Sequence, residues 1–132
     1  MCIRDSNRIK YLNMLLDGRG IVNMENARKL EQEFNTCQKI LTAFGDEVRQ
    51  ELLMLMVMES REGIRVADLA DKTSLTRSAV SHHMQILKDA GVVKSRKEGK
   101  FVYYYFDATC KNIDALLRLF EDVKRVIQSG KV

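Results

Sequence analysis

Residues 64–106 constrain the fold of this chain more than any other part of it. Residues 67–73 have a short helical pattern, residues 74–76 are typical of a tight turn, and residues 77–90 have a longer helical pattern. Two runs of β-branched and aromatic residues follow within 93–106 and flank a charged turn that contains glycine. Two helices, a tight turn and a β-hairpin in this order predict a winged helix-turn-helix.

Single residues at the ends of these elements support the assignment. Thr76 can cap the helix that begins at Arg77, and Gly91 stands where helices commonly end in a left-handed residue. The segment 97–100 separates the two strands of the expected hairpin. Because residues 64–66 can add only a short strand, we expect a mainly α-helical fold with a small β-hairpin wing.

Amphipathic patterns on either side of this unit predict the remaining helices. In residues 25–44 the apolar positions recur at alternating steps of four and three, which is typical of a helix with one apolar face. Asp46 can cap a helix over residues 47–59, which is apolar on most sides and is therefore expected to be the central core helix. A second apolar stripe on residues 113–127 predicts a C-terminal helix. The fold therefore has five or six helices.

The first 23 residues differ from the rest of the chain. Residues 17–20, Asp-Gly-Arg-Gly, interrupt any regular pattern, and Met24 begins a fresh, strongly helical one. We interpret residues 1–23 either as a leader or as a short extra helix over residues 7–16. Residues 24–129 are expected to form the winged helix-turn-helix domain.

Composition and charge exclude several classes of protein. The longest near-continuous apolar run, residues 52–58, is too short to cross a membrane, and three scattered cysteines do not make a disulfide framework. Without a secretory signal pattern, a cytoplasmic location is expected. The net charge is only +4, but residues 72–100 hold seven basic and two acidic residues, whereas residues 24–71 hold six basic and ten acidic ones. Such a basic block is expected of a DNA-binding surface.

Polar and basic side chains gather on the second motif helix and on the hairpin. Arginine can bind O6 and N7 of guanine, glutamine can pair with adenine, and lysine or arginine at the hairpin tip can bind phosphates. The residues expected to contact DNA are Thr76, Arg77, Ser78, Ser81, His82, Gln85, Arg96, Lys97 and Lys100. His83 points about 100° away from His82 on a helix, so we expect it to pack or to contact the wing.

Four segments have the spacing of motifs from a known family. Residues 44–49 are Phe-Gly-Asp-Glu-Val-Arg, and residues 78–87 are Ser-Ala-Val-Ser-His-His-Met-Gln-Ile-Leu. Residues 89–93 and 99–104 lead into and through the expected wing. Together these segments resemble the second-helix signature, recognition helix and wing of the ArsR/SmtB family of bacterial repressors. The resemblance covers about residues 27–127.

The resemblance implies a homodimer that binds an inverted-repeat operator in double-stranded DNA and represses its own operon. The departures from the family pattern are small. Gln50 and Met84 stand where the family usually has leucine.

The two terminal apolar stripes point to a dimer independently of the resemblance. Two amphipathic helices leave more apolar surface than one small winged domain can cover, and a two-fold protein matches a palindromic site. The alternative is that both stripes pack on their own domain. We predict dimerisation through the terminal helices, with interface residues Leu30, Phe34, Leu41, Leu116, Leu117, Phe120, Val123 and Ile127.

The two metal sites best known in this family have no counterpart in the sequence. The thiol site would fall at residues 66–68, which hold no cysteine, and residues 111–129 hold no histidine for the other site. Cys37 and Cys110 remain weak candidates for a thiol pair that is oxidised or binds a soft metal, and the alternative is two small core residues. We expect no metal and no cofactor.

The sequence has no phosphate-binding glycine loop and no nucleophile–base pair, so we do not expect an enzyme. The main prediction is a sequence-specific DNA-binding transcriptional regulator that acts as a homodimeric repressor. One alternative is a winged-helix module that binds a partner protein, although the basic residues of the second helix and wing argue against it. The other is a winged repressor of another class that responds to redox change or to an organic ligand.

Overall fold

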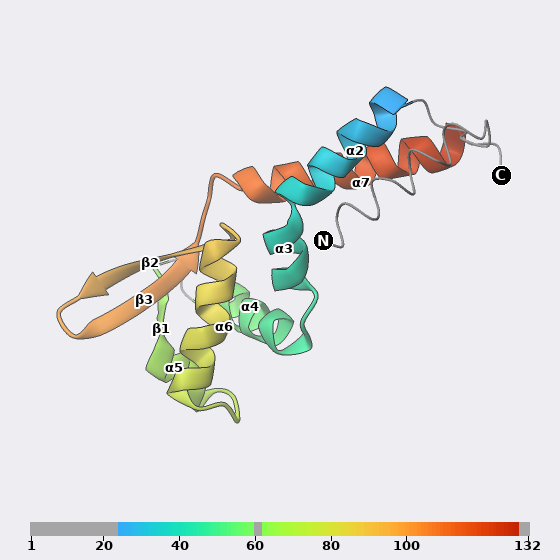
Figure 1. Ribbon diagram of the computed structural model, residues 1–132. Helices are drawn as coiled ribbons and strands as arrows, with labels where there is room; N and C mark the ends of the chain where they lie inside the picture. The colour runs from blue at the N-terminus through green and yellow to red at the C-terminus, as the bar shows by residue number, and fades with distance from the viewer. Residues whose placement is uncertain (1–23, 60–61, 130–132) are drawn as a thin grey trace, which may run out of the picture. The chain divides into compact units, whose positions relative to one another are not determined.

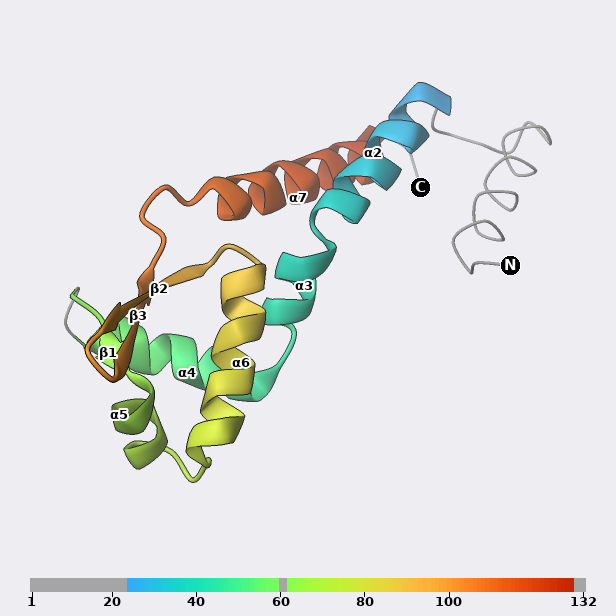
Figure 2. The same cartoon turned by 60° about the vertical axis from the view of Figure 1, so that its left-hand side comes forward.

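The computed structural model describes residues 24–59 and 62–129 (Figures 1 and 2). Its elements follow one another in the order α2 (Met24–Thr36), α3 (Gln38–Phe44), α4 (Glu47–Met58), β1 (Ile64–Arg65), α5 (Val66–Asp71), α6 (Arg77–Asp89), β2 (Val93–Glu98), β3 (Phe101–Phe106) and α7 (Lys111–Ser129). The six described helices and the small antiparallel sheet confirm the mainly α-helical fold with a β-hairpin wing. The leader or extra helix expected within residues 1–23 lies outside the described residues.

The described residues form two compact units, one of residues 24–35 with 119–129, and one of residues 36–59 with 62–118. The sequence predicted a domain over residues 24–129. Because the described residues begin and end at the same positions, these limits stay a prediction. In the first unit, Lys29 on α2 pairs with Asp122 on α7 at 3.6 Å from Nζ to Oδ2. Leu119 on α7 is fully buried, although it was not among the residues expected on the apolar stripe.

The helix expected over residues 25–44 is interrupted at Cys37, which has φ −94° and ψ 6°. Asn35 and Thr36 just before it have low helix propensity because their side chains compete for backbone hydrogen bonds. One continuous helix was therefore wrong. The next boundary is as expected, because the Asp46 side chain caps α4 by accepting a hydrogen bond from the backbone N–H of Arg49 at 3.0 Å.

Helices α5 and α6 form the helix-turn-helix of the second unit and lie next to each other in both views (Figures 1 and 2). The turn is closed by Thr73, whose hydroxyl donates to the carbonyl of Leu69 at 3.0 Å and accepts from the N–H of Leu75 at 3.2 Å. Thr76 then caps α6 by accepting from the N–H of Ala79 at 3.1 Å. The fully buried side chains at this motif are Leu69 on α5, Val80, Met84 and Leu87 on α6, and Leu52 on α4.

The sheet has the strand order β1-β3-β2, and both pairings are antiparallel. Within the hairpin, Glu98 lies opposite Phe101, so Gly99 and Lys100 form a two-residue turn. Gly99 has φ 61°, the left-handed backbone that favours glycine at the first position of such a turn. The turn is thus two residues shorter than the 97–100 segment expected to separate the strands.

Helix α4 does not have the central position that its composition predicted. Leu52, Leu53 and Met56 are buried, but Val57 and Met58 are 63% and 74% exposed. The cause is that only one side of α4 packs within the unit. No helix within residues 24–59 and 62–129 combines the length and the hydrophobicity needed to cross a membrane.

Candidate nucleic-acid interface

One face of α6 is exposed and polar along its N-terminal half. Because α6 has 3.6 residues per turn, its buried residues Val80, Met84 and Leu87 fall on one side and leave the opposite side free. Every residue predicted to read DNA from this helix is exposed, namely Thr76, Arg77, Ser78, Ser81, His82 and Gln85. The predicted set therefore forms one continuous surface.

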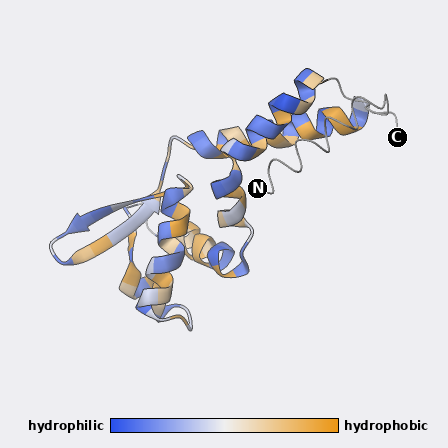
Figure 3. Ribbon diagram, viewed as in Figure 1, coloured by the Kyte–Doolittle hydropathy of each residue, from blue (hydrophilic) through white to orange (hydrophobic). Residues whose placement is uncertain are grey.

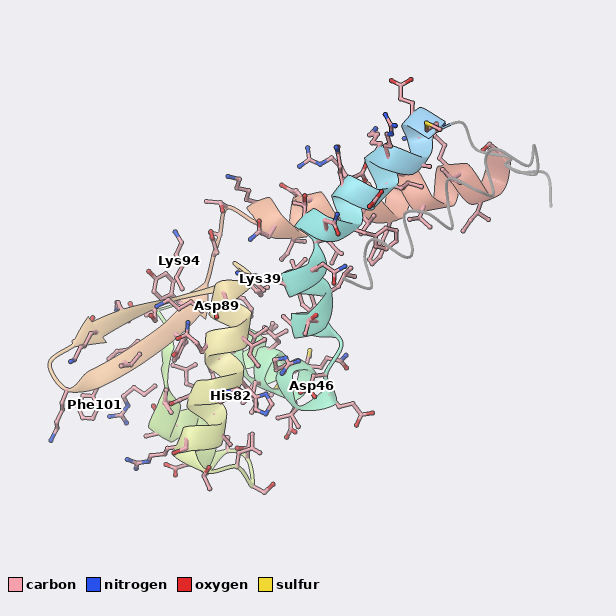
Figure 4. The ribbon with its side chains drawn as sticks, in the orientation of Figure 1. Lys39, Asp46, His82, Asp89, Lys94 and Phe101 are labelled. Atoms are coloured by element: carbon pink, nitrogen blue, oxygen red, sulfur yellow. The ribbon has the colours of Figure 1, made fainter. Side chains whose placement is uncertain are left out.

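Charge at the two ends of this face differs. At the N-terminus, Arg77 directly follows the cap residue Thr76 and lies in the first turn, where unpaired N–H groups and the helix dipole attract anions. Near the C-terminus, the amide of Gln85 donates to the carboxylate of Asp89 at 2.9 Å. Figure 4 labels Asp89 on α6. The Gln85 side chain, predicted to contact a base, is therefore bonded to Asp89 in this structure.

The wing presents two basic side chains at its tip. Lys97 and Lys100 are both exposed and extend from the end of β2 and from the turn. Figure 3 shows hydrophilic residues along outer β2 and hydrophobic ones at the start of β3. The exposed Phe101, which Figure 4 labels beside the tip, is the first of these.

Arg96, the third predicted wing residue, has partners within the protein. Its Nε donates to Glu98 at 2.9 Å, its Nη1 donates to the backbone carbonyl of Glu62, and its guanidinium lies 4.8 Å from the Tyr103 ring centroid. The hydrogen bond to the Glu98 carboxylate raises the pKa of Arg96. In this conformation Arg96 connects the two strands and the preceding loop.

Arg65 contacts the wing near its tip, a role that sequence reasoning missed. Its guanidinium makes a two-pronged bond to Asp68, at 2.9 and 3.1 Å, and lies 4.8 Å from the Phe101 ring centroid. The hydrogen bond from Arg65 lowers the pKa of Asp68. Arg65 thus joins the start of α5 to β3, and its three-residue spacing from Asp68 was a signal that could have revealed the pair.

His83 also has a partner that the sequence did not predict. Its Nδ1 lies 3.2 Å from Nη1 of Arg49, and the carboxylate of Asp46 is 3.9 Å away. The expectation that His83 packs is met by its half-buried position, but its partner lies on α4 and not on the wing. Since 34 residues separate Arg49 from His83, no local pattern could have revealed this bond.

The residues predicted for a dimer interface divide between the two units. The first unit holds Leu30, Phe34, Phe120, Val123 and Ile127, and the second holds Leu41, Leu116 and Leu117. Phe120, Leu117 and Ile127 are 51%, 57% and 64% exposed, whereas Leu30, Leu41, Leu116 and Val123 are half-buried. Within the described part of the chain, α7 therefore carries large apolar side chains that are exposed to solvent.

The two thiol candidates have different surroundings. Cys37 is buried, and Cys110 is exposed with φ 52°. In the part of the chain that the structure describes, no three histidine, cysteine or acidic side chains are grouped so as to hold a metal ion.

Comparison with known proteins adds to this geometry. Residues 46–95 match the family described as bacterial regulatory protein, arsR family. The chain is 35% identical over 74 residues to an uncharacterized HTH-type transcriptional regulator of Methanocaldococcus jannaschii, a match that covers 56% of this chain and 81% of the relative. It is 32% identical over 94 residues to a transcriptional repressor SmtB homolog of Synechocystis, covering 69% of this chain and 71% of that protein. The family is one of transcriptional regulators and not of enzymes.

A solved structure shares the fold. The homodimeric winged helix-turn-helix DNA-binding domain of a Mycobacterium bovis protein superposes with a TM-score of 0.54, at 22% identity, over 76% of this chain and 88% of the other. The superposition supports the winged helix-turn-helix assignment.

Proposed function

We propose that this chain, which belongs to the arsR family of bacterial regulatory proteins and is a transcriptional regulator, reads DNA with α6 in the major groove. The observation that carries the proposal is the exposed polar face of α6, opposite its buried side. A major groove admits one helix, and short polar side chains near the N-terminus of that helix reach the base edges. Arg77 would bind guanine, Gln85 would bind adenine, and Ser78 and Ser81 would bind phosphate or base.

The wing would hold the phosphate backbone beside the reading helix. Lys97 and Lys100 are exposed, so they can replace counterions on phosphates. Lys100 would give up only the contact of its ammonium with the Phe101 ring, whose centroid is 5.7 Å away. Arg96 would reach a phosphate only by leaving Glu98. We therefore assign the main backbone contacts to the two lysines.

We further propose that the protein works as a homodimer on an inverted repeat. Leu117, Phe120 and Ile127 on α7 expose more apolar surface than a small monomer usually leaves, and a second copy would cover it. The Mycobacterium bovis domain is described as homodimeric. Two copies related by a two-fold axis present two reading helices to two half-sites. If the inverted repeat overlaps a promoter, the bound dimer would block transcription and act as a repressor. We place this activity in the cytoplasm.

Selection of bound duplexes from a random DNA library by the full chain tests this function. We expect enrichment of a palindromic motif. Arg77→Ala should weaken binding to the enriched duplex, whereas Lys39→Ala, an exposed charge on α3, should leave affinity within about twofold. Absence of any enriched motif, or equal loss in both variants, would overturn the proposal.

A further inference from the structure

Arg49 is the one buried charged side chain among the described residues, at 8% exposure. Its Nε donates to the carbonyl of Ala43 and its Nη2 to the carbonyl of Thr42, each at 2.9 Å. These carbonyls belong to the last turn of α3, where the Thr42 carbonyl also accepts from the N–H of Gly45 at 3.3 Å. Two of the three guanidinium nitrogens are therefore used to fix the end of α3 against the start of α4.

The third nitrogen, Nη1, faces the recognition helix α6. It lies 3.2 Å from Nδ1 of His83, which is half-buried. A guanidinium can only donate hydrogen bonds, so Nδ1 must accept, and an imidazole nitrogen accepts only when it carries no proton. The contact therefore requires a neutral imidazole with its proton on Nε2.

The groups around His83 give its protonated form no contact as close as the hydrogen bond that its neutral form accepts from Arg49. The imidazolium would stand 3.2 Å from the guanidinium of Arg49. The nearest anion is the Asp46 carboxylate at 3.9 Å, and its Oδ2 already caps α4. His82, on the same helix, has its ring centroid 5.9 Å from that of His83 (Figure 4 labels His82 and Asp46).

Other charged groups on elements packed against α6 are engaged elsewhere or exposed. On α5, Asp68 is bonded to Arg65. Lys72, just after α5, pairs with Glu59 at 2.7 Å. Lys39 on α3 and Lys94 on β2 are exposed.

We infer that Arg49 and the neutral form of His83 position the recognition helix for DNA, so that protonation of His83 weakens binding; this rests on the proposed function. His83 lies next to His82 and two residues from Ser81, within the stretch of α6 that would read bases. A binding constellation tolerates displacements of only about 0.5 Å. Loss of the Arg49 bond, or capture of Asp46 by an imidazolium, would remove a side-chain hydrogen bond that links α4 to α6, and we expect a displacement on this scale. Arg49 and His83 are positioning residues and touch no base.

The sign of this effect is unusual. Protonation of a histidine that faces DNA adds positive charge and strengthens binding to phosphates. Protonation of His83 should do the opposite, because it removes a hydrogen-bond acceptor. Imidazoles ordinarily take up a proton between about pH 8 and pH 5, so the two cases separate in that range.

The experiment compares wild type, His83→Asn and His82→Asn on the duplex that the wild-type full chain enriches at pH 8. In His83→Asn, the amide oxygen of the introduced asparagine takes the place of Nδ1 as an acceptor but does not titrate. Wild type and His82→Asn should each lose about fivefold or more in affinity between pH 8 and pH 5.5, beyond any change seen with random DNA. His83→Asn should bind as wild type does at pH 8 and should not lose affinity at pH 5.5; a gain from added charge at His82, which faces the DNA, is compatible with the inference.

Two results would overturn the inference. One is a pH response of His83→Asn equal to that of wild type, and the other is a response that disappears in His82→Asn. Arg49→Met guards against an effect on folding alone: we expect it to be folded by circular dichroism, to bind weakly at pH 8 and to show no further loss at pH 5.5. If Arg49→Met is unfolded, the His83→Asn comparison still decides. If no duplex is enriched at all, the proposed function fails and this inference fails with it, whereas enrichment followed by equal pH responses in wild type and His83→Asn overturns the inference alone.

Discussion

A side chain at Gly91 would collide with Asn112: a Cβ atom built there lies 1.9 Å from Nδ2 of Asn112. That same amide donates to the carbonyl of Ala90 at 2.9 Å, where α6 ends. Gly91 also has φ 76°, a backbone that side chains rarely adopt. The start of α7 is thereby fastened to the end of the recognition helix.

Gly91→Ala should destabilise the protein by about 2–3 kcal/mol, from the left-handed backbone and the displaced amide together. Asn112→Ala alone should cost about 1 kcal/mol. The double variant should be less destabilised than the sum, because the loss of the Asn112 hydrogen bond contributes to both single variants but occurs only once in the double variant. Denaturant unfolding measures all three, and strict additivity would show that the two residues do not interact.

Low pH should weaken the ion pair between Arg65 and Asp68. The hydrogen bond from Arg65 holds the pKa of Asp68 below its ordinary value. A carboxyl with a lowered folded pKa stabilises the protein above its unfolded pKa, and that stabilisation is lost as pH falls through the folded pKa. The unfolding free energy of wild type should therefore fall more steeply below about pH 4 than that of Asp68→Asn. Parallel curves would show that the pair adds nothing.

Lys97→Ala and Lys100→Ala should each weaken binding to all DNA sequences alike. Each removes about one phosphate contact, so the slope of log affinity against log salt should fall by about one unit. Fluorescence anisotropy at several salt concentrations measures the slope. Lys39→Ala, away from the wing, serves as the matched control, and an equal change of slope in that variant would remove the wing from the interface.

A charge on the exposed stripe of α7 should separate the proposed dimer. Leu117→Glu or Phe120→Glu would bury a carboxylate in an apolar contact, and we expect the dimer dissociation constant to rise about a hundredfold. Arg118→Glu, exposed on the side of α7 opposite Phe120, should leave it within about twofold. Sedimentation equilibrium distinguishes the two. If the dimer dissociation constant is unchanged in Leu117→Glu and Phe120→Glu, this surface is not the dimer interface.

The features that the sequence predicted best are those determined by residues close together in the chain. Asp46 and Thr76 cap the helices that they were expected to cap, and Gly91 has the left-handed backbone expected at a helix end. These signals act over three or four residues, so they can be recognised in a sequence.

What the sequence did not predict depends on residues far apart in the chain. The bond of Arg49 to His83 and that of Arg96 to the Glu62 carbonyl each span 34 residues. The exposure of Met58 likewise depends on which elements pack against α4, and its apolar character alone predicted burial. The interruption at Cys37 was missed because an apolar stripe records which face is buried and not whether the backbone is continuous.

The central claim is that α6 reads bases, and a cycle between Arg77 and single base pairs tests it most directly. Each position of the enriched duplex is changed in turn, and its affinity is measured with wild type and with Arg77→Ala. The account predicts that one G·C pair per half-site costs wild type about 1–3 kcal/mol when replaced and costs Arg77→Ala almost nothing, while other positions cost both proteins alike. Equal costs for the two proteins at every position would contradict the claim that Arg77 reads a base.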